Sequence, residues 1–272
     1  DLQVGGSWDQ PKVEGQVRLA DADAYLTAAG IRLRDVGLSI RLERGLIRVD
    51  SFHVASGDGA LDGTAIIRLD GWRPVEYQGT LSGDRFETIH LPELQLLSSP
   101  RLTFTGTPKR LSVRGDILVP ELRITHTSRN VIPASKDVIL EGAAEPSGWA
   151  FPMDLDVRVH LALGKKVLVQ AEGIDARLTG GVDLAFNDVK RITSRGEIRV
   201  VDGRYRAYGT DLEIVRGRLF FDGGPIDRPA LDILALRTVR EVRAGVTAVG
   251  LLSAPVIKLY SEPPMSETDI LA

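Results

Sequence analysis

The sequence predicts an all-β protein built as an antiparallel meander. Apolar and charged residues alternate with a period of two in segments such as 31–34 (IRLR) and 153–163 (MDLDVRVHLAL). Such alternation is typical of strands with one apolar face and one face exposed to solvent. Asp–Gly pairs such as Asp58-Gly59 and Asp202-Gly203 separate these segments and readily supply the positive φ angles of tight hairpin turns. No window of helical periodicity competes with this pattern.

Some of the strand segments are similar to one another, which indicates an internal repeat. Three similar pentapeptides, GQVRL at 15–19, GDILV at 115–119 and GEIRV at 196–200, are each expected to begin a strand. The segment from Gly30 (GIRLRDVGLSIRLERGLIRVD) is also similar to the segment from Gly209 (GTDLEIVRGRLFFDG). Since the offsets are unequal, this is loose duplication, and it predicts an elongated sheet extended by adding hairpins.

A twisted sheet of this length cannot leave a whole apolar face open to water. It must close into a barrel, pair with a second sheet, or fold lengthwise into a trough. The opposite face carries charges of both signs, which keep it soluble. Examples of these charged residues are Arg32, Arg34, Glu43, Arg199, Glu213 and Arg218.

Composition excludes several classes of function and site. The net charge of −3 gives a nucleic-acid partner no electrostatic support. The absence of cysteine removes disulfides, zinc–thiolate sites and thiol catalysis, without fixing the compartment. The uncharged stretch 244–257 contains Pro255 and is too short to span a bilayer. Because the chain does not begin with Met and ends just after a helix-capping pattern at Ser266–Asp269, we expect a fragment of a longer protein.

No constellation of residues predicts catalysis, a metal or a cofactor. The histidines share no ligand spacing and are interpreted as ordinary strand or surface residues; they are His53, His90, His126 and His160. The segment 56–63 (SGDGALDG) faintly resembles a calcium loop but lacks its distal glutamate. Asp154 and Asp156 lie on the polar side of an alternating strand, which favours a solvated face over an acid–base pair. The sequence therefore predicts a protein that is not an enzyme.

The C-terminal third carries a resemblance to a known family. The segment GRYRAYGTDLEIVRGRLFFDGG at 203–224, with GVTAVGLLSAPVIKLYSEPPMSETDILA at 245–272, resembles the TamB C-terminal domain of the AsmA-like superfamily. The matching positions include Gly203, Tyr205, Tyr208, Gly209, Leu212, Gly217, Phe220, Gly223, Pro229, Leu231, Arg237, Gly245, Gly250, Pro255 and Pro263. The resemblance covers essentially the whole chain and is most specific in 196–271. One departure is Arg228, where the family pattern has Asn, and the family's apolar continuation after Ile270-Leu271 is missing.

This resemblance implies a single elongated β domain over 1–272, the C-terminal part of a periplasmic protein anchored in the inner membrane of a Gram-negative bacterium. It implies a sheet curved into a taco-like trough with an apolar interior, with its C-terminal part near the outer membrane. The implied partners are phospholipid acyl chains and a TamA-like outer-membrane barrel protein. The implied roles are phospholipid transport toward the outer membrane and assembly of outer-membrane proteins such as autotransporters.

The two lines of reasoning predict a lipid conduit lined by the alternating apolar residues. The predicted lining consists of Val17, Leu19, Ile31, Leu33, Leu38, Ile40, Leu42, Leu155, Val157, Val159, Leu161, Ile198, Val200, Leu212, Ile214 and Leu219. A scaffold that accepts β-strands from a barrel partner at its open edges is the alternative. A closed β-sandwich used as a spacer fits the alternation equally well.

Overall fold

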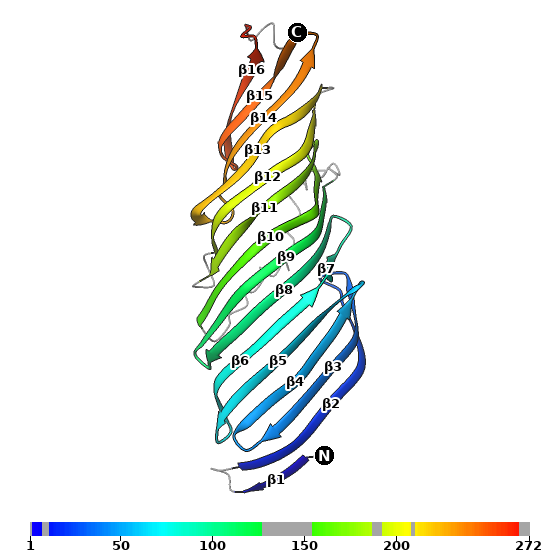
Figure 1. Cartoon of the computed structure of the whole chain (residues 1–272), viewed down its shortest axis with the longest axis vertical. Coiled ribbons are helices and arrows are strands. Elements are labelled where there is room, and N and C mark those ends of the chain that lie inside the picture. Colours follow the sequence, from blue (N-terminus) through cyan, green and yellow to red (C-terminus); the bar gives the residue numbers. More distant parts are fainter. Residues whose placement is uncertain (1, 7–10, 127–153, 187–191, 208–209, 267–272) are drawn as a thin grey trace, which may run out of the picture.

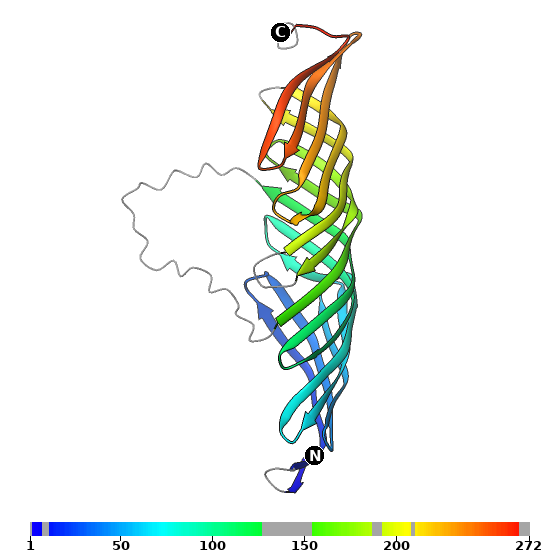
Figure 2. The same cartoon turned by 90° about the vertical axis from the view of Figure 1, so that its left-hand side faces the viewer.

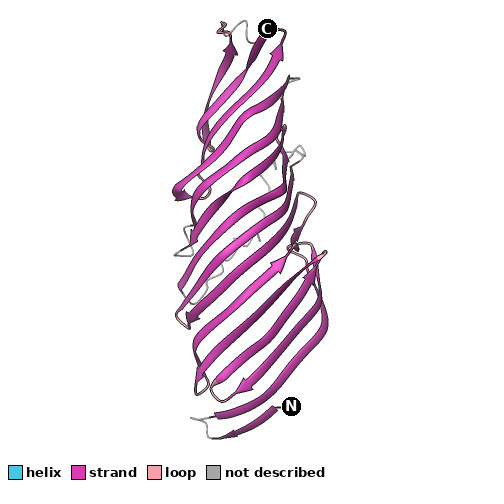
Figure 3. Cartoon of the chain, in the orientation of Figure 1, coloured by secondary structure: helices cyan, strands magenta, loops and turns pink. Residues whose placement is uncertain are grey.

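The computed structural model describes residues 2–6, 11–126, 154–186, 192–207 and 210–266, and this described part consists of strands and connecting turns without a helix (Figure 3). None of its elements is therefore a helix long and apolar enough to span a membrane. The strands are β1 Leu2–Gly6, β2 Pro11–Leu26, β3 Ile31–Glu43, β4 Leu46–Ser56, β5 Gly59–Asp70, β6 Arg73–Asp84, β7 Phe86–His90, β8 Leu94–Thr107, β9 Arg110–His126, β10 Asp154–Ala171, β11 Ile174–Phe186, β12 Ile192–Ala207, β13 Thr210–Pro225, β14 Ala230–Val239, β15 Val242–Leu251 and β16 Ala254–Glu262.

These strands form one 16-stranded sheet in which neighbours follow chain order, except that β8 lies beside both β6 and β7. The strands slope across the long axis of the molecule, with β1 at one end and β16 at the other (Figure 1). Seen from the side, the sheet curves into an open trough (Figure 2). The prediction of an elongated, curved all-β sheet is confirmed, and the described strands form neither a closed barrel nor a two-sheet sandwich.

One pair of neighbouring strands departs from the antiparallel pattern. β9 and β10 pair in parallel, from Asp154 opposite Arg110 to Ala171 opposite His126. Parallel neighbours need a long connection, because a tight hairpin can join only antiparallel strands. Residues 127–153, which connect these two strands, lie outside the described residues, as does the predicted helix start after Ser266.

The three repeated pentapeptides lie inside strands, so the prediction that each begins a strand is wrong. Gly15, Gly115 and Gly196 fall within β2, β9 and β12, with φ of 153°, 143° and 145°. A Cβ on Gly115 would lie 2.0 Å from the carbonyl oxygen of Arg101 on the neighbouring strand. Glycine at this position therefore marks a close backbone approach inside the sheet, where a side chain has no room.

Candidate functional site

Cross-strand register joins the predicted lining residues into rows on one face of the sheet. Directly opposed residues share a face. One row runs from Leu19 through Leu38, Phe52, Gly63, Leu81, Leu102 and Gly115 to Val159. A second row runs from Val17 through Ile40, Val49, Ala65, Gly79, Phe104 and Val113 to Val157. The face that carries these rows is called the concave face below, and the opposite one the outer face.

A hollow of about 560 Å³ lies in the concave face over β3, β4, β5, β6, β8 and β9. It is lined by Leu38, Val49, Phe52, Gly63, Thr64, Ala65, Thr80, Leu81, Leu102, Phe104, Leu111 and Val113. Glycines help to make room for it. Phe104 lies opposite Gly79, and a Cβ on that glycine would meet the phenyl ring at 2.3 Å. The large ring therefore occupies the space that a side chain at Gly79 would fill.

β7 covers the concave face beside this hollow. Its Phe86 is 7% exposed and forms a packed cluster with Ile31 and Val54, which are 3% and 5% exposed. Leu33 and Phe52 pack against the same cluster. The amide of His90, at the end of β7, donates to the carbonyl of Ala29 across the rim, at 2.8 Å. Of the predicted lining, Ile31 and Leu33 thus lie in closed packing, whereas Leu38 lies in the hollow.

Other predicted lining residues lie toward the two ends of the sheet. Val17 and Leu19 are 41% and 46% exposed, because β1 pairs with β2 only as far as Gly15. In the C-terminal third, Val200 and Ile214 lie beside Gly203 and Gly217. Leu212 is 6% exposed opposite Tyr205, and Ile198 lies opposite Leu219.

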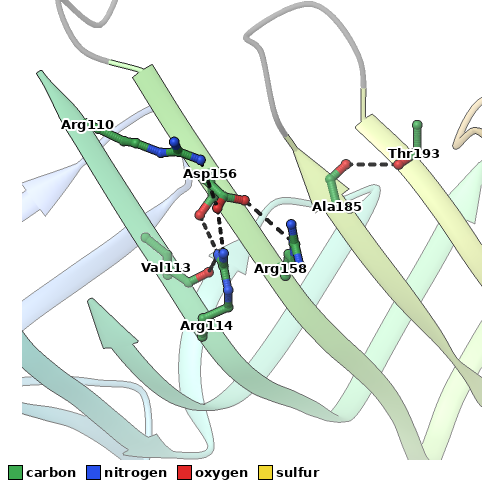
Figure 4. A network of polar contacts seen from close by, with 7 residues as sticks. All are labelled: Arg110, Val113, Arg114, Asp156, Arg158, Ala185 and Thr193. Carbon is green, nitrogen blue, oxygen red and sulfur yellow. Dashed lines mark hydrogen bonds and ion pairs between the residues drawn. The ribbon is translucent and has the colours of Figure 1, made fainter. Parts of the chain in front are cut away.

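The outer face is stabilised by ion pairs, of which the network around Asp156 is the most buried (Figure 4). Arg114 Nη2 donates to Asp156 Oδ2 at 2.5 Å, and its Nη1 donates to the Asp156 carbonyl at 2.6 Å. Arg110 and Arg158 complete the network at 3.4 Å and 3.6 Å from the carboxylate. The hydrogen bond from Arg114 lowers the pKa of Asp156 despite the opposing effect of burial. Asp156 therefore stays charged as the centre of a structural network.

The histidines also act as ordinary members of the sheet. Nδ1 of His53, His90 and His160 lies 2.6–2.7 Å from the carboxylates of Asp62, Glu87 and Asp183, respectively. Asp62, which pairs with His53, belongs to the segment 56–63 that faintly resembles a calcium loop. No group of three or more metal-ligating side chains occurs among the described residues.

Sequence reasoning missed the residues from β6, β8 and β9 that form much of the hollow. Leu102 and Phe104 do alternate with polar residues in LTFTGT, so the same signal that marked Leu38 was present there. It also missed Phe86, because a five-residue strand that crosses the ends of its neighbours leaves no periodic pattern.

Comparison with known proteins agrees with the resemblance read from the sequence. Residues 50–272 match the family described as TamB C-terminal domain. The chain is also similar to the translocation and assembly module subunit TamB of Haemophilus influenzae, with 25% identity over 303 aligned residues. That alignment covers 100% of this chain and 22% of the relative, so the chain spans less than a quarter of the relative's length. Since the family match extends over most of the chain, the protein belongs to the TamB C-terminal domain family.

Proposed function

We propose that the domain carries lipid acyl chains along its concave face. The observation that supports this most directly is the hollow of about 560 Å³, whose lining is dominated by aliphatic and phenyl side chains. Each methylene group withdrawn from water contributes about 0.8 kcal/mol, so a palmitoyl chain gains on the order of 10 kcal/mol. An apolar lining without buried charge provides this gain while holding no headgroup fixed. Transport of this kind needs no catalytic residue.

The proposed path continues from the hollow toward the C-terminal end. Leu161 lies opposite Ile117 and Val182 on the neighbouring strands, and Ile198 lies between Gly180 and Leu219. We include these apolar positions, with the rest of the predicted lining, in the path. An acyl chain would then exchange one aliphatic surface for the next as it moves along the trough.

For the longer protein we propose a place in the envelope of a Gram-negative bacterium. The relative is named as a subunit of a translocation and assembly module. On this basis the whole protein would be anchored in the inner membrane, cross the periplasm and carry phospholipid toward the outer membrane. Its C-terminal domain would lie near a TamA-like outer-membrane barrel protein.

The test is native mass spectrometry and lipid extraction of the domain purified from cells without detergent. Leu102→Glu places a carboxylate in the hollow, and Thr103→Glu places the same charge one residue away, on the outer face. Because a carboxylate loses its hydration against an acyl chain, Leu102→Glu is expected to abolish bound phospholipid. Thr103→Glu is expected to retain it. Equal lipid content in the two folded variants, or none in the wild-type, refutes the proposal.

A second function, acceptance of β-strands from a partner, is favoured by the open edge at β16. Among the described strands only β15 pairs with β16, whose Val256 and Ile257 are 53% and 66% exposed. An unpaired edge with apolar side chains can add a strand through main-chain hydrogen bonds. Under this function, Val256→Pro or Ile257→Pro reduces binding of the periplasmic domains of the barrel partner while the phospholipid content stays unchanged. Loss of both together in a folded variant would contradict a separate strand-accepting role.

A further inference from the structure

β7 is joined to the sheet by strand pairing along one edge only. The chain leaves β6 at Arg85, whose φ is 46°, and enters β8 through a tight turn in which the main chains of Leu91 and Leu94 bond to each other. Between these two points β7 pairs with residues 95–98, the first part of β8. The Arg85 amide also donates to the Ser99 hydroxyl of β8 at 2.9 Å. One edge of β7 is therefore fixed to β8 along its whole length.

The other edge of β7 lies against two hairpin ends. A Cβ on Gly30, in the β2–β3 turn, would lie 2.3 Å from the His90 carbonyl oxygen, and one on Gly59, at the start of β5, would lie 2.2 Å from that of Arg85. Among the described residues, one backbone hydrogen bond crosses this edge, from the His90 amide to the Ala29 carbonyl at 2.8 Å. The contact is therefore close packing with little backbone pairing to hold it.

Phe86 provides the apolar contact that holds this second edge and closes one side of the hollow. Its ring is packed against Ile31 and Val54. Phe52 packs against this cluster and also lines the hollow. β7 thus lies between the hollow and the side of the trough that carries the β2–β3 and β4–β5 turns. A ligand that approaches the hollow from that side has to pass β7.

Ser56 opposes the closed position of β7. It is the last residue of β4, its side chain is fully buried, and its hydroxyl has no hydrogen-bond partner in the described structure. Its cross-strand partner is Gly59, which lies against Arg85 at the start of β7. A hydroxyl that loses its water without gaining a partner disfavours the closed state by roughly fivefold to 100-fold. The closed position therefore balances burial of Phe86 against dehydration of Ser56.

We propose that β7 is a strap hinged on β8, which swings away from the β2–β3 and β4–β5 turns and admits an acyl chain to the hollow from that side. This inference rests on the proposed function, because the hollow must hold the chain. It adds a route of entry and the element that controls it. Since the strap closes over the empty and the filled hollow alike, it sets the rates of uptake and release and leaves the affinity unchanged.

The test locks the strap with a disulfide. A Cβ on Gly57, in the β4–β5 turn, would lie 3.0 Å from the Glu87 Cβ, close to the roughly 3.8 Å of a disulfide. The sequence contains no cysteine, so Gly57→Cys/Glu87→Cys can form one bridge only. Stopped-flow fluorescence of cis-parinaric acid, a polyene fatty acid, compares this variant oxidised with glutathione disulfide and then reduced. The oxidised form is expected to take up the probe at least about tenfold more slowly, with unchanged equilibrium affinity.

Two substitutions under the strap are expected to change the uptake rate in opposite directions. Phe86→Ala should accelerate uptake about 100-fold, because it removes the packing that keeps the strap closed. Ser56→Ala should slow it at least about fivefold, because the dehydrated hydroxyl is gone. Neither residue lines the hollow, so the affinity for the probe should change less than about twofold. The control Ser51→Ala removes an exposed hydroxyl from the same strand and should leave the rate unchanged.

Each outcome decides between a moving strap and a fixed one. Equal uptake by the oxidised and reduced forms overturns the inference and leaves the proposed function standing. So do rates that Phe86→Ala and Ser56→Ala leave unchanged or shift in the same direction, and these two variants decide the question alone if the bridge does not form. Failure of the wild-type to bind the probe refutes the acyl-chain hollow itself, and the strap's role with it.

Discussion

Phe86 anchors β7 on the concave face, and its removal tests whether this strand is held by the packed cluster. Phe86→Ala takes a phenyl ring out of contact with Ile31 and Val54, which are both at most 5% exposed. Truncation of a buried phenylalanine costs about 3 kcal/mol, the low end of the usual range, which suits a small cluster. Because β8 is the one described strand that pairs with β7, this loss should appear as local opening of β7.

Native-state hydrogen exchange at the His90 amide measures the opening of β7 directly. The amide donates to the Ala29 carbonyl at 2.8 Å, a bond that exists only while β7 lies over the rim. A loss of about 3 kcal/mol predicts exchange roughly 100-fold faster. The control Ile257→Ala truncates a side chain that is 66% exposed and should leave this amide unchanged. An acceleration below about threefold in Phe86→Ala would refute the anchoring role.

Three further substitutions follow from the packing and the charges. Ser56→Ala should keep or raise the melting temperature, because this fully buried side chain has an oxygen without a hydrogen-bond partner in the described structure. Asp156→Asn should lower the melting temperature at neutral pH, and the deficit should shrink below about pH 4. The lowered pKa of Asp156 provides stability above the unfolded-state pKa, which is lost as the pH falls through the folded-state pKa. Gly79→Ala should cost about 2 kcal/mol in urea unfolding, because its Cβ would lie 2.4 Å from the Thr64 carbonyl oxygen.

Two of these substitutions, Ser56→Ala and Gly79→Ala, have a matched control. Ser99→Ala removes a hydroxyl that accepts from the Arg85 amide at 2.9 Å, so it should destabilise where Ser56→Ala does not. Gly37→Ala adds a methyl group whose nearest neighbour lies 3.8 Å away and should be close to neutral. A destabilising Ser56→Ala, a melting deficit of Asp156→Asn that is constant with pH, or a neutral Gly79→Ala would each contradict the reasoning behind it.

The period of two was sufficient to predict the fold because each strand buries one face only. In the segment 155–161, Leu155 and Val157 lie opposite Leu111 and Val113, which line the hollow. The parallel pairing of β9 and β10 could not be predicted, because alternation is the same in parallel and antiparallel strands. Likewise, the glycine of the repeated pentapeptide suggested the start of a strand, but Gly115 lies inside one. There it allows a close approach of the neighbouring strand's backbone, which the pattern of a single strand does not encode.

The candidate site was less predictable than the fold. Which apolar residues form the hollow depends on curvature and on β7, and neither is encoded in the alternation of a single strand. Leu38 and Ile31 have the same pattern in the sequence, yet one lines the hollow and the other is 3% exposed under Phe86.

The two faces of this single-layer sheet are stabilised by different physical means. On the outer face, arginines pair with acids, as Arg114 does with Asp156 and Arg216 with Asp232, so that face needs no second layer. The concave face has no such pairing at the hollow, and apart from β7 no described strand covers it. Apolar surface left in this state costs free energy in water, and an acyl chain removes that cost without requiring a fixed partner. The open hollow is thus a disadvantage to an isolated domain and an advantage to one that handles lipid.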